Sequence, residues 1–190
     1  MNKYSSHKKR NNLLLSGIVI SLGLFVFSQS FAEEPSRIEY KIKAGYLYNF
    51  TKFITWPKNE SETFNLCILG EDPFGSIINP IEKRTVKNKP IRLYRLQVAD
   101  EVKHCHIVYL SPLFPENIYL PGVLTVSSRI PALTVSESKQ FTEAGGMIAF
   151  FQRDGRVKLH INLEVLRRSG LEISAKLLEV AEIYEGESND

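Results

Sequence analysis

The sequence predicts an α/β protein: a single-domain sandwich with a mostly parallel, mixed sheet flanked by helices, a late β-hairpin and C-terminal helices. Short apolar runs alternate with helical segments through the first two thirds of the chain, which is the order expected of a parallel sheet with helical crossovers. The dipeptide Asp154-Gly155 lies between two alternating segments and indicates the hairpin. The length of 190 residues and the hydrophobic fraction of 43% fit one globular domain.

Residues 1–32 have the three-part pattern of a cleaved secretory signal peptide. A basic segment around Lys9 precedes the uncharged run 13–27, and Ala32 is the small residue before the expected cut. The run is shorter than the roughly 20 residues that cross a bilayer, so cleavage is favoured over an uncleaved anchor. We therefore expect a protein of the Gram-negative periplasm, with one domain over residues 33–185 and a polar tail over 186–190.

The charge of the expected mature chain argues against nucleic acid as a partner. Four of the 24 basic residues and none of the 21 acidic residues lie in the first 32 positions, which leaves a net charge of about −1. Binding to a phosphate backbone needs concentrated positive charge. Nucleic acid is therefore excluded as the main partner.

The first helix is expected over residues 38–56, where Tyr46 and Phe50 belong to one apolar face. Pro57 ends this helix, because the residue before a proline is disfavoured in the helical conformation. Lys43 falls mostly off the apolar face.

The remaining elements follow from apolar runs, turn residues and capping residues. Asp72 would cap a helix that begins at Pro73 and reaches about Ile81. His160 lies on the polar face of the second hairpin arm, so we expect it to be exposed. The other expected elements are strands at 64–69, 91–98, 106–111 and 123–127, helices at 114–120 and 138–143, hairpin arms at 147–152 and 156–161, a helix capped by Asn162 that ends at Arg168, and a last helix from about Ser174.

The two cysteines, Cys67 and Cys105, both lie in the expected mature chain. Export places them in an oxidising compartment, so a disulfide is favoured over two buried free thiols. His104 and His106 could form a metal-binding pair, but a third ligand would be needed and none is nearby in the sequence. A metal site that joins Cys105 to these two histidines stays open as an alternative. A solvated strand entry is the simpler interpretation of the two histidines.

No catalytic motif of the serine hydrolase, zinc protease or nucleotide-binding kind is present, so we expect neither an enzyme nor a cofactor. A hydrolase or redox enzyme that uses Glu71, Asp72 or His104 stays open as an alternative. A first candidate binding surface is the aromatic face of the first helix and the corner after it, with Tyr46, Phe53, Trp56 and Pro57. A second is a crevice at the carboxyl ends of the strands, lined by Gly70, Glu71, Asp72, Phe74 and Gly75.

Five segments, taken in order, resemble the YfiR/HmsC-like family of periplasmic regulators. Together they cover essentially the whole expected mature chain. They are KAGYLYNFTKFITWP at 43–57, FNLCILGEDPFG at 64–75, HCHIVYLS at 104–111, LTVSESKQFTEAGGMIAFF at 133–151 and VKLHINLEVLRRSGLEISAKLLEVA at 157–181.

The resemblance implies a repressor that binds the periplasmic sensor region of an inner-membrane diguanylate cyclase and lowers cyclic di-GMP, biofilm and exopolysaccharide. It also implies an OmpA-like outer-membrane lipoprotein as a second partner, and a homodimer stays open. Cys67 and Cys105 match one of the two disulfides of the best-described system, whereas the second pair has no counterpart here. A periplasmic module that binds a small ligand and serves another signalling protein is the alternative function.

Overall fold

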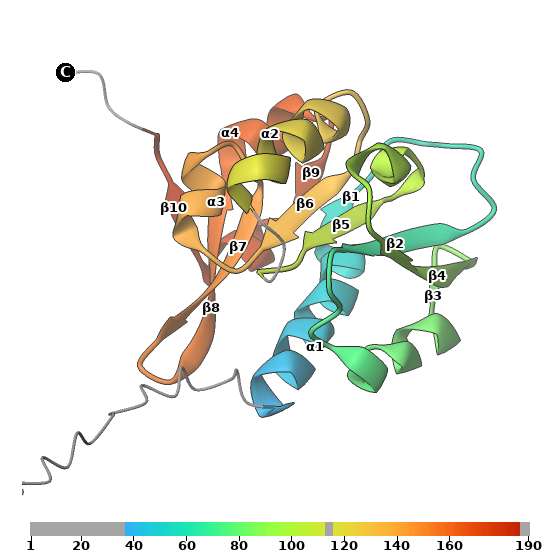
Figure 1. Cartoon of the computed structure of the whole chain (residues 1–190), viewed down its shortest axis with the longest axis horizontal. Helices are drawn as coiled ribbons and strands as arrows, with labels where there is room; N and C mark the ends of the chain where they lie inside the picture. Colours follow the sequence, from blue (N-terminus) through green and yellow to red (C-terminus); the bar gives the residue numbers. More distant parts are fainter. Residues whose placement is uncertain (1–36, 113–115, 187–190) are drawn as a thin grey trace, which may run out of the picture. The chain divides into compact units, whose positions relative to one another are not determined.

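The computed structural model describes residues 37–112 and 116–186, without the side chains of residues 116–119. The chain divides into the units Met1–Glu34 and Pro35–Asp190, and every described element belongs to the second unit (Figure 1). The predicted signal peptide lies outside the described residues, as does the tail after residue 186. None of the helices in the described part is long and apolar enough to cross a membrane.

The domain is built on an eight-stranded sheet with the order β10-β8-β7-β6-β5-β2-β4-β3. The antiparallel neighbours are the hairpins β3–β4 and β7–β8, and the other neighbours are parallel. The predicted mostly parallel, mixed sheet is therefore confirmed. The strands are β2 (Phe64–Leu69), β3 (Thr85–Val86), β4 (Lys89–Leu96), β5 (Ile107–Leu110), β6 (Leu133–Ser136), β7 (Ile148–Arg153), β8 (Arg156–Asn162) and β10 (Ala181–Tyr184).

Helices cover both faces of this sheet. Figure 1 shows α1 on one side and α2 and α3 on the other. Alternate residues of β2 accordingly enter two cores: Leu66 packs with the α1 side, and Leu69 packs with the α2 side. The helices are α1 (Arg37–Phe53), α2 (Glu116–Ser127), α3 (Lys139–Glu143), α4 (Leu163–Arg168) and α5 (Ala175–Leu178), with 3-10 turns η1 (Gly75–Ile77), η2 (Asn79–Lys83) and η3 (Ala99–His104).

The first helix ends three residues earlier than its pattern predicts. Pro57 has no N–H to donate to the carbonyl of Phe53, four residues before it. That carbonyl accepts instead from the N–H of Ser174, at 2.8 Å. The next residues form β1 (Ile54–Thr55), which pairs antiparallel with β9 (Glu172–Ile173). The proline is thus the reason why the chain leaves the helix and enters a second, two-stranded sheet.

Two predicted elements are wrong in type. Residues 123–127, expected as a core strand, complete α2, and the third core strand is β6. The apolar residues of α2 also fit a helical repeat, since Val123 is buried and Ser127 donates to the carbonyl of Val123, four residues earlier, at 2.7 Å. The expected last helix is only the four-residue α5, after which β10 pairs parallel with β8.

Local signals predicted the other junctions well. Asp154 and Gly155 have φ values of 52° and 67°, as a type I′ hairpin turn requires. The side chain of Asn162 accepts from the N–H of Val165 at 3.0 Å and caps α4. Asp72 accepts from the N–H of Phe74 at 2.7 Å, but the segment that it begins forms the 3-10 turns η1 and η2 instead of an α-helix.

Candidate functional site

The corner after α1 holds the only tryptophan of the chain, Trp56. Its indole N–H donates to the carbonyl of His106 at 3.0 Å. Its ring meets Phe64 edge-on, with centroids 5.0 Å apart. Trp56 is therefore half-buried and held in one orientation, whereas Pro57 beside it is exposed.

The other two residues of the predicted partner surface lie deeper than a free surface would place them. Tyr46 is half-buried and lies against Phe50 and Phe150, with ring centroids at 6.3 and 5.8 Å. Phe53 is also half-buried and packs against the same core. Of the four predicted residues, Pro57 is exposed and the three aromatic residues are half-buried.

His106 lies directly under this corner and is 6% exposed. Its Nδ1 accepts from the backbone N–H of Asn65 at 3.0 Å, and Nε2 lies 2.7 Å from the side-chain amide of Asn59. Burial, and then the positive charge of Lys89, lower the pKa of His106 below its ordinary value of 6.5. The interpretation of His106 as a solvated strand entry is therefore wrong, although His104 is exposed.

Two cavities meet at Asn59 and His106, which line both of them. The smaller one, of about 290 Å³, lies at the Trp56–Pro57 corner. The larger one, of about 760 Å³, extends from there over the start of β2 and β5. Its walls include Tyr94, Leu96, Glu101, His104, Ile130 and the two cysteines.

Cys67 and Cys105 form a disulfide in the wall of the larger cavity, with Cα atoms 5.9 Å apart. The bridge joins β2 to the residue before His106. Cys105 is therefore unavailable as a metal ligand. Among the described residues, no three His, Cys, Asp or Glu side chains are placed to hold a metal ion.

The predicted crevice at the carboxyl ends of the strands is partly filled by its own residues. Phe74 is 2% exposed and packs edge-on against Tyr40 and Tyr109, at 5.2 and 4.8 Å. Asp72 forms an ion pair with Arg95 at 2.7 Å. Neither cavity described above includes a residue of the segment 70–75.

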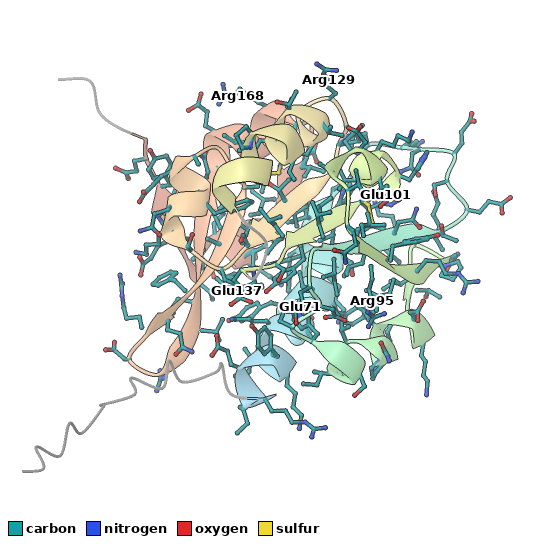
Figure 2. The ribbon with its side chains drawn as sticks, viewed as in Figure 1. Glu71, Arg95, Glu101, Arg129, Glu137 and Arg168 are labelled. Atoms are coloured by element: carbon teal, nitrogen blue, oxygen red, sulfur yellow. A yellow bond between two sulfur atoms is a disulfide. The ribbon has the colours of Figure 1, made fainter. Side chains whose placement is uncertain are left out.

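The residues of the hydrolase alternative lie at opposite ends of the sheet. Glu71 and Asp72 follow the carboxyl end of β2, whereas His104 precedes the amino end of the parallel strand β5. Figure 2 shows Glu71 and Arg95 at the same end of the sheet as Glu137. The structure does not bring the two carboxylates and the imidazole together.

A buried charge cluster at the carboxyl end of the sheet was missed by the sequence analysis. Lys43, expected mostly off the apolar face, is only 2% exposed. Its Nζ lies 2.5 Å from one carboxylate oxygen of Glu39 and 2.5 Å from one of Glu137. Tyr109 donates to Glu137, and burial together with that carboxylate raises the pKa of the phenol. The i, i+4 spacing of Glu39 and Lys43 was the available signal.

His160, expected to be exposed, is also buried, at 7%. Its Nδ1 lies 2.5 Å from the hydroxyl of Thr142, which itself donates to the carbonyl of Lys139 at 2.7 Å. His160 is covered because α3 packs on this end of β8 and β10 pairs beside it, with Glu182 opposite His160. Burial and the charge of Lys139 lower the pKa of His160.

Solved structures of other proteins share this fold, among them the following two. One is the ABC domain in complex with L-Trp from Streptococcus pneumonia, with a TM-score of 0.53 and 10% identity over 74% of this chain and 60% of that chain. The other is a conserved domain protein from Vibrio cholerae O1 biovar eltor, with a TM-score of 0.52 and 8% identity over 76% of this chain and 59% of that chain. The chain thus spans about three fifths of either structure, and the likeness shows the fold alone.

The comparison with protein families goes further than the comparison with solved structures. No curated protein matches the chain. A family model described as YfiR/HmsC-like matches residues 40–182, from the first turn of α1 into β10. The protein belongs to the YfiR/HmsC-like family.

Proposed function

We propose that the protein is a periplasmic regulator that binds and represses the periplasmic sensor region of an inner-membrane diguanylate cyclase. Repression would lower cyclic di-GMP and, with it, biofilm and exopolysaccharide output. The observation that carries the proposal is the family match over residues 40–182. The predicted signal peptide over residues 1–32 supports it, because export places the chain beside such a sensor.

The Trp56–Pro57 corner is the surface that we assign to the cyclase. A repressor must bind the inactive state of its target more tightly than the active state, by a few kcal/mol, to shift the population. Aromatic residues held in place before binding serve this purpose, since little side-chain entropy is lost on association. Trp56 meets that condition through its contacts with His106 and Phe64, whereas Tyr46 and Phe53 pack against the core behind it.

The same proposal includes two further partners, an OmpA-like outer-membrane lipoprotein and a second copy of this chain. An OmpA-like outer-membrane lipoprotein would relieve repression by sequestering the protein, and it would compete with the cyclase if it used the same corner. A homodimer would present two such corners. The function requires binding alone, so no residue is assigned a catalytic role.

A small-ligand-binding module is the second candidate, favoured by the cavity of about 760 Å³. This volume falls in the range of about 300–1,000 Å³ that is usual for small-molecule sites. The structure from Streptococcus pneumonia with the same fold was solved in complex with L-Trp. A thermal-shift screen of amino acids and other metabolites tests this candidate, because a ligand of the folded state raises Tm.

The experiment for the main proposal measures intracellular cyclic di-GMP in three strains: the parent, a deletion of this gene, and the deletion with the gene restored. We expect cyclic di-GMP to rise on deletion and to return to the parental level on restoration. Cross-linking in the periplasm then identifies the cyclase. An unchanged level in the deletion strain, under conditions in which the parent makes the protein, would contradict repression and leave the ligand-binding module as the better candidate.

A further inference from the structure

The smaller cavity has an unusual combination of an aromatic floor and a cationic rim. Trp56, Phe64 and His106 contribute rings to its wall, and the apolar side chains of Ile54 and Val86 complete it. The charged residues that line it are all lysines, namely Lys58, Lys87 and Lys89. Within the described part of the chain, no acidic side chain lines this cavity.

The three lysines have no ion-pair partner in the part of the chain that the structure describes. Lys89 donates to the side-chain and backbone oxygens of Asn59, at 2.9 and 3.1 Å, which are uncharged acceptors. Three like charges around one small cavity repel one another, and that repulsion is relieved when an anion enters.

The positive potential reaches the floor of the cavity. Lys89 is one of the two causes that lower the pKa of His106, so its charge acts across the site that an occupant would fill. Lys87 and Asn88 both have left-handed backbone conformations, with φ of 48° and 68°. This tight turn between β3 and β4 holds Lys87 and Lys89 on the rim, two residues apart.

We propose that this cavity receives an acidic side chain of the protein that the regulator binds. The inference rests on the proposed function and adds the chemistry of the partner: an aspartate or glutamate next to an apolar patch. The carboxylate would lie among Lys58, Lys87 and Lys89, while the neighbouring apolar groups would cover Trp56 and Pro57. An apolar centre with charges at its rim is the usual arrangement of a protein–protein hot spot.

The smaller cavity can receive a single side chain. Its volume is about 290 Å³, at the lower limit of the range of about 300–1,000 Å³ typical of small-molecule sites. The adjoining cavity of about 760 Å³ is the one with room for a whole ligand. The cavity also opens beside the exposed Pro57, at the corner where a partner surface would approach.

The test replaces the charges at the rim and keeps the aromatic floor. A Lys58→Glu/Lys87→Glu double variant reverses two exposed charges of the cavity. The matched control is Lys83→Glu/Lys176→Glu, which reverses two exposed charges that do not line it. Each variant restores the deletion strain, and cyclic di-GMP is measured together with the periplasmic level and Tm of the protein.

We expect wild type and the control variant to bring cyclic di-GMP down to the parental level. The Lys58→Glu/Lys87→Glu variant should leave it at the level of the deletion strain, at equal abundance and Tm. A Lys58→Gln/Lys87→Gln variant, which removes the charges without reversing them, should repress partially. If the Glu variant represses as fully as wild type, the inference is wrong while the proposed function stands. If wild type itself fails to lower cyclic di-GMP, the proposed function falls, and this inference with it.

Two further measurements on purified protein separate other anions from a partner's carboxylate. Succinate and inorganic phosphate are added in a thermal-shift assay, and phosphatidylglycerol vesicles are used in a sedimentation assay. We expect the same response from wild type and the Lys58→Glu/Lys87→Glu variant. A rise in Tm, or sedimentation with vesicles, that wild type shows and the variant loses would assign the cavity to a free anion or to a lipid surface and would overturn the inference.

Discussion

Lys43 and Glu137 are 94 residues apart in the chain and form a buried ion pair, with Nζ and Oε2 separated by 2.5 Å. Glu39, one turn before Lys43 on α1, contacts the same ammonium at 2.5 Å. Gln152 of β7 donates to Glu39, and Tyr109 of β5 donates to Glu137. One lysine thus joins α1 to β5, to β7 and to the turn after β6 through two carboxylates.

Replacement of Lys43 by methionine should destabilise the domain strongly. The change leaves Glu39 and Glu137 buried without their shared cation, and removal of one partner from a buried ion pair costs about 3–5 kcal/mol. Urea unfolding measures this loss. The matched control is Lys41→Met, because Lys41 lies on the same helix and is exposed, so that its replacement should change the free energy of unfolding by about 0.5 kcal/mol or less. Equal stability of the two variants would contradict the structural role of Lys43.

The free energy of unfolding should depend on pH through the protonation of His106. Its pKa is lower in the folded protein than the ordinary value of 6.5, so between these two pKa values the unfolded chain binds more protons. The free energy of unfolding therefore rises with pH in that window, and the stabilisation is lost as the pH falls from 6.5 through the lower pKa of the folded protein. Protonation would also put a proton on Nδ1, which accepts from the N–H of Asn65.

A His106→Asn variant tests this dependence, because its Oδ1 can accept from Asn65 and does not titrate. Urea unfolding between about pH 5 and 7 should show a smaller slope of stability against pH than in wild type. His160 retains its own contribution, since burial lowers its pKa as well. The control is His104→Asn, which removes a histidine at an exposed position. A slope unchanged by His106→Asn would mean that this histidine does not titrate differently on folding.

Loss of the disulfide should destabilise the domain by an amount that depends on the length of the chain segment that it closes. Cys67 and Cys105 are 38 residues apart in the sequence, and the chain-entropy model gives about 4 kcal/mol for a loop of this length. Urea unfolding with and without a reductant measures the difference. The Cys67→Ala/Cys105→Ala variant should show no effect of the reductant. Identical unfolding of wild type in both conditions would contradict a stabilising bridge.

Gly146 should not tolerate even the smallest side chain. A Cβ at this position would overlap the ring of Phe141, a fully buried residue of the α2-side core. Gly146→Ala should therefore cost about 1–3 kcal/mol, as overpacking does. Gly45→Ala is the opposite case. Gly45 is exposed on α1, and an added Cβ meets nothing within 4 Å. This substitution should therefore stabilise the helix by about 0.5–1 kcal/mol. A neutral Gly146→Ala would show that Phe141 can move away.

Local signals in the sequence determined the elements whose causes are local. The apolar run 64–69 became β2, the dipeptide Asp154-Gly155 became the hairpin turn, and Asn162 became the cap of α4. In these three cases, one or a few adjacent side chains favour the backbone conformation. The disulfide joins residues 38 apart and was predicted on another ground, namely the expected export and the even count of cysteines.

The tertiary structure decided everything that depends on a distant neighbour. The apolar residues 123–127 suit a strand or a helix equally, and their place on the sheet made them part of α2. The sequence pattern predicts a helix where β10 lies, but this segment pairs with the edge of β8 instead. The pairing buries His160. Lys43 is buried because its partner Glu137 is supplied by the turn after β6. The two cavities at His106 arise in the same way, since chain segments far apart in the sequence surround them, and their side chains meet only when the sheet brings the segments together.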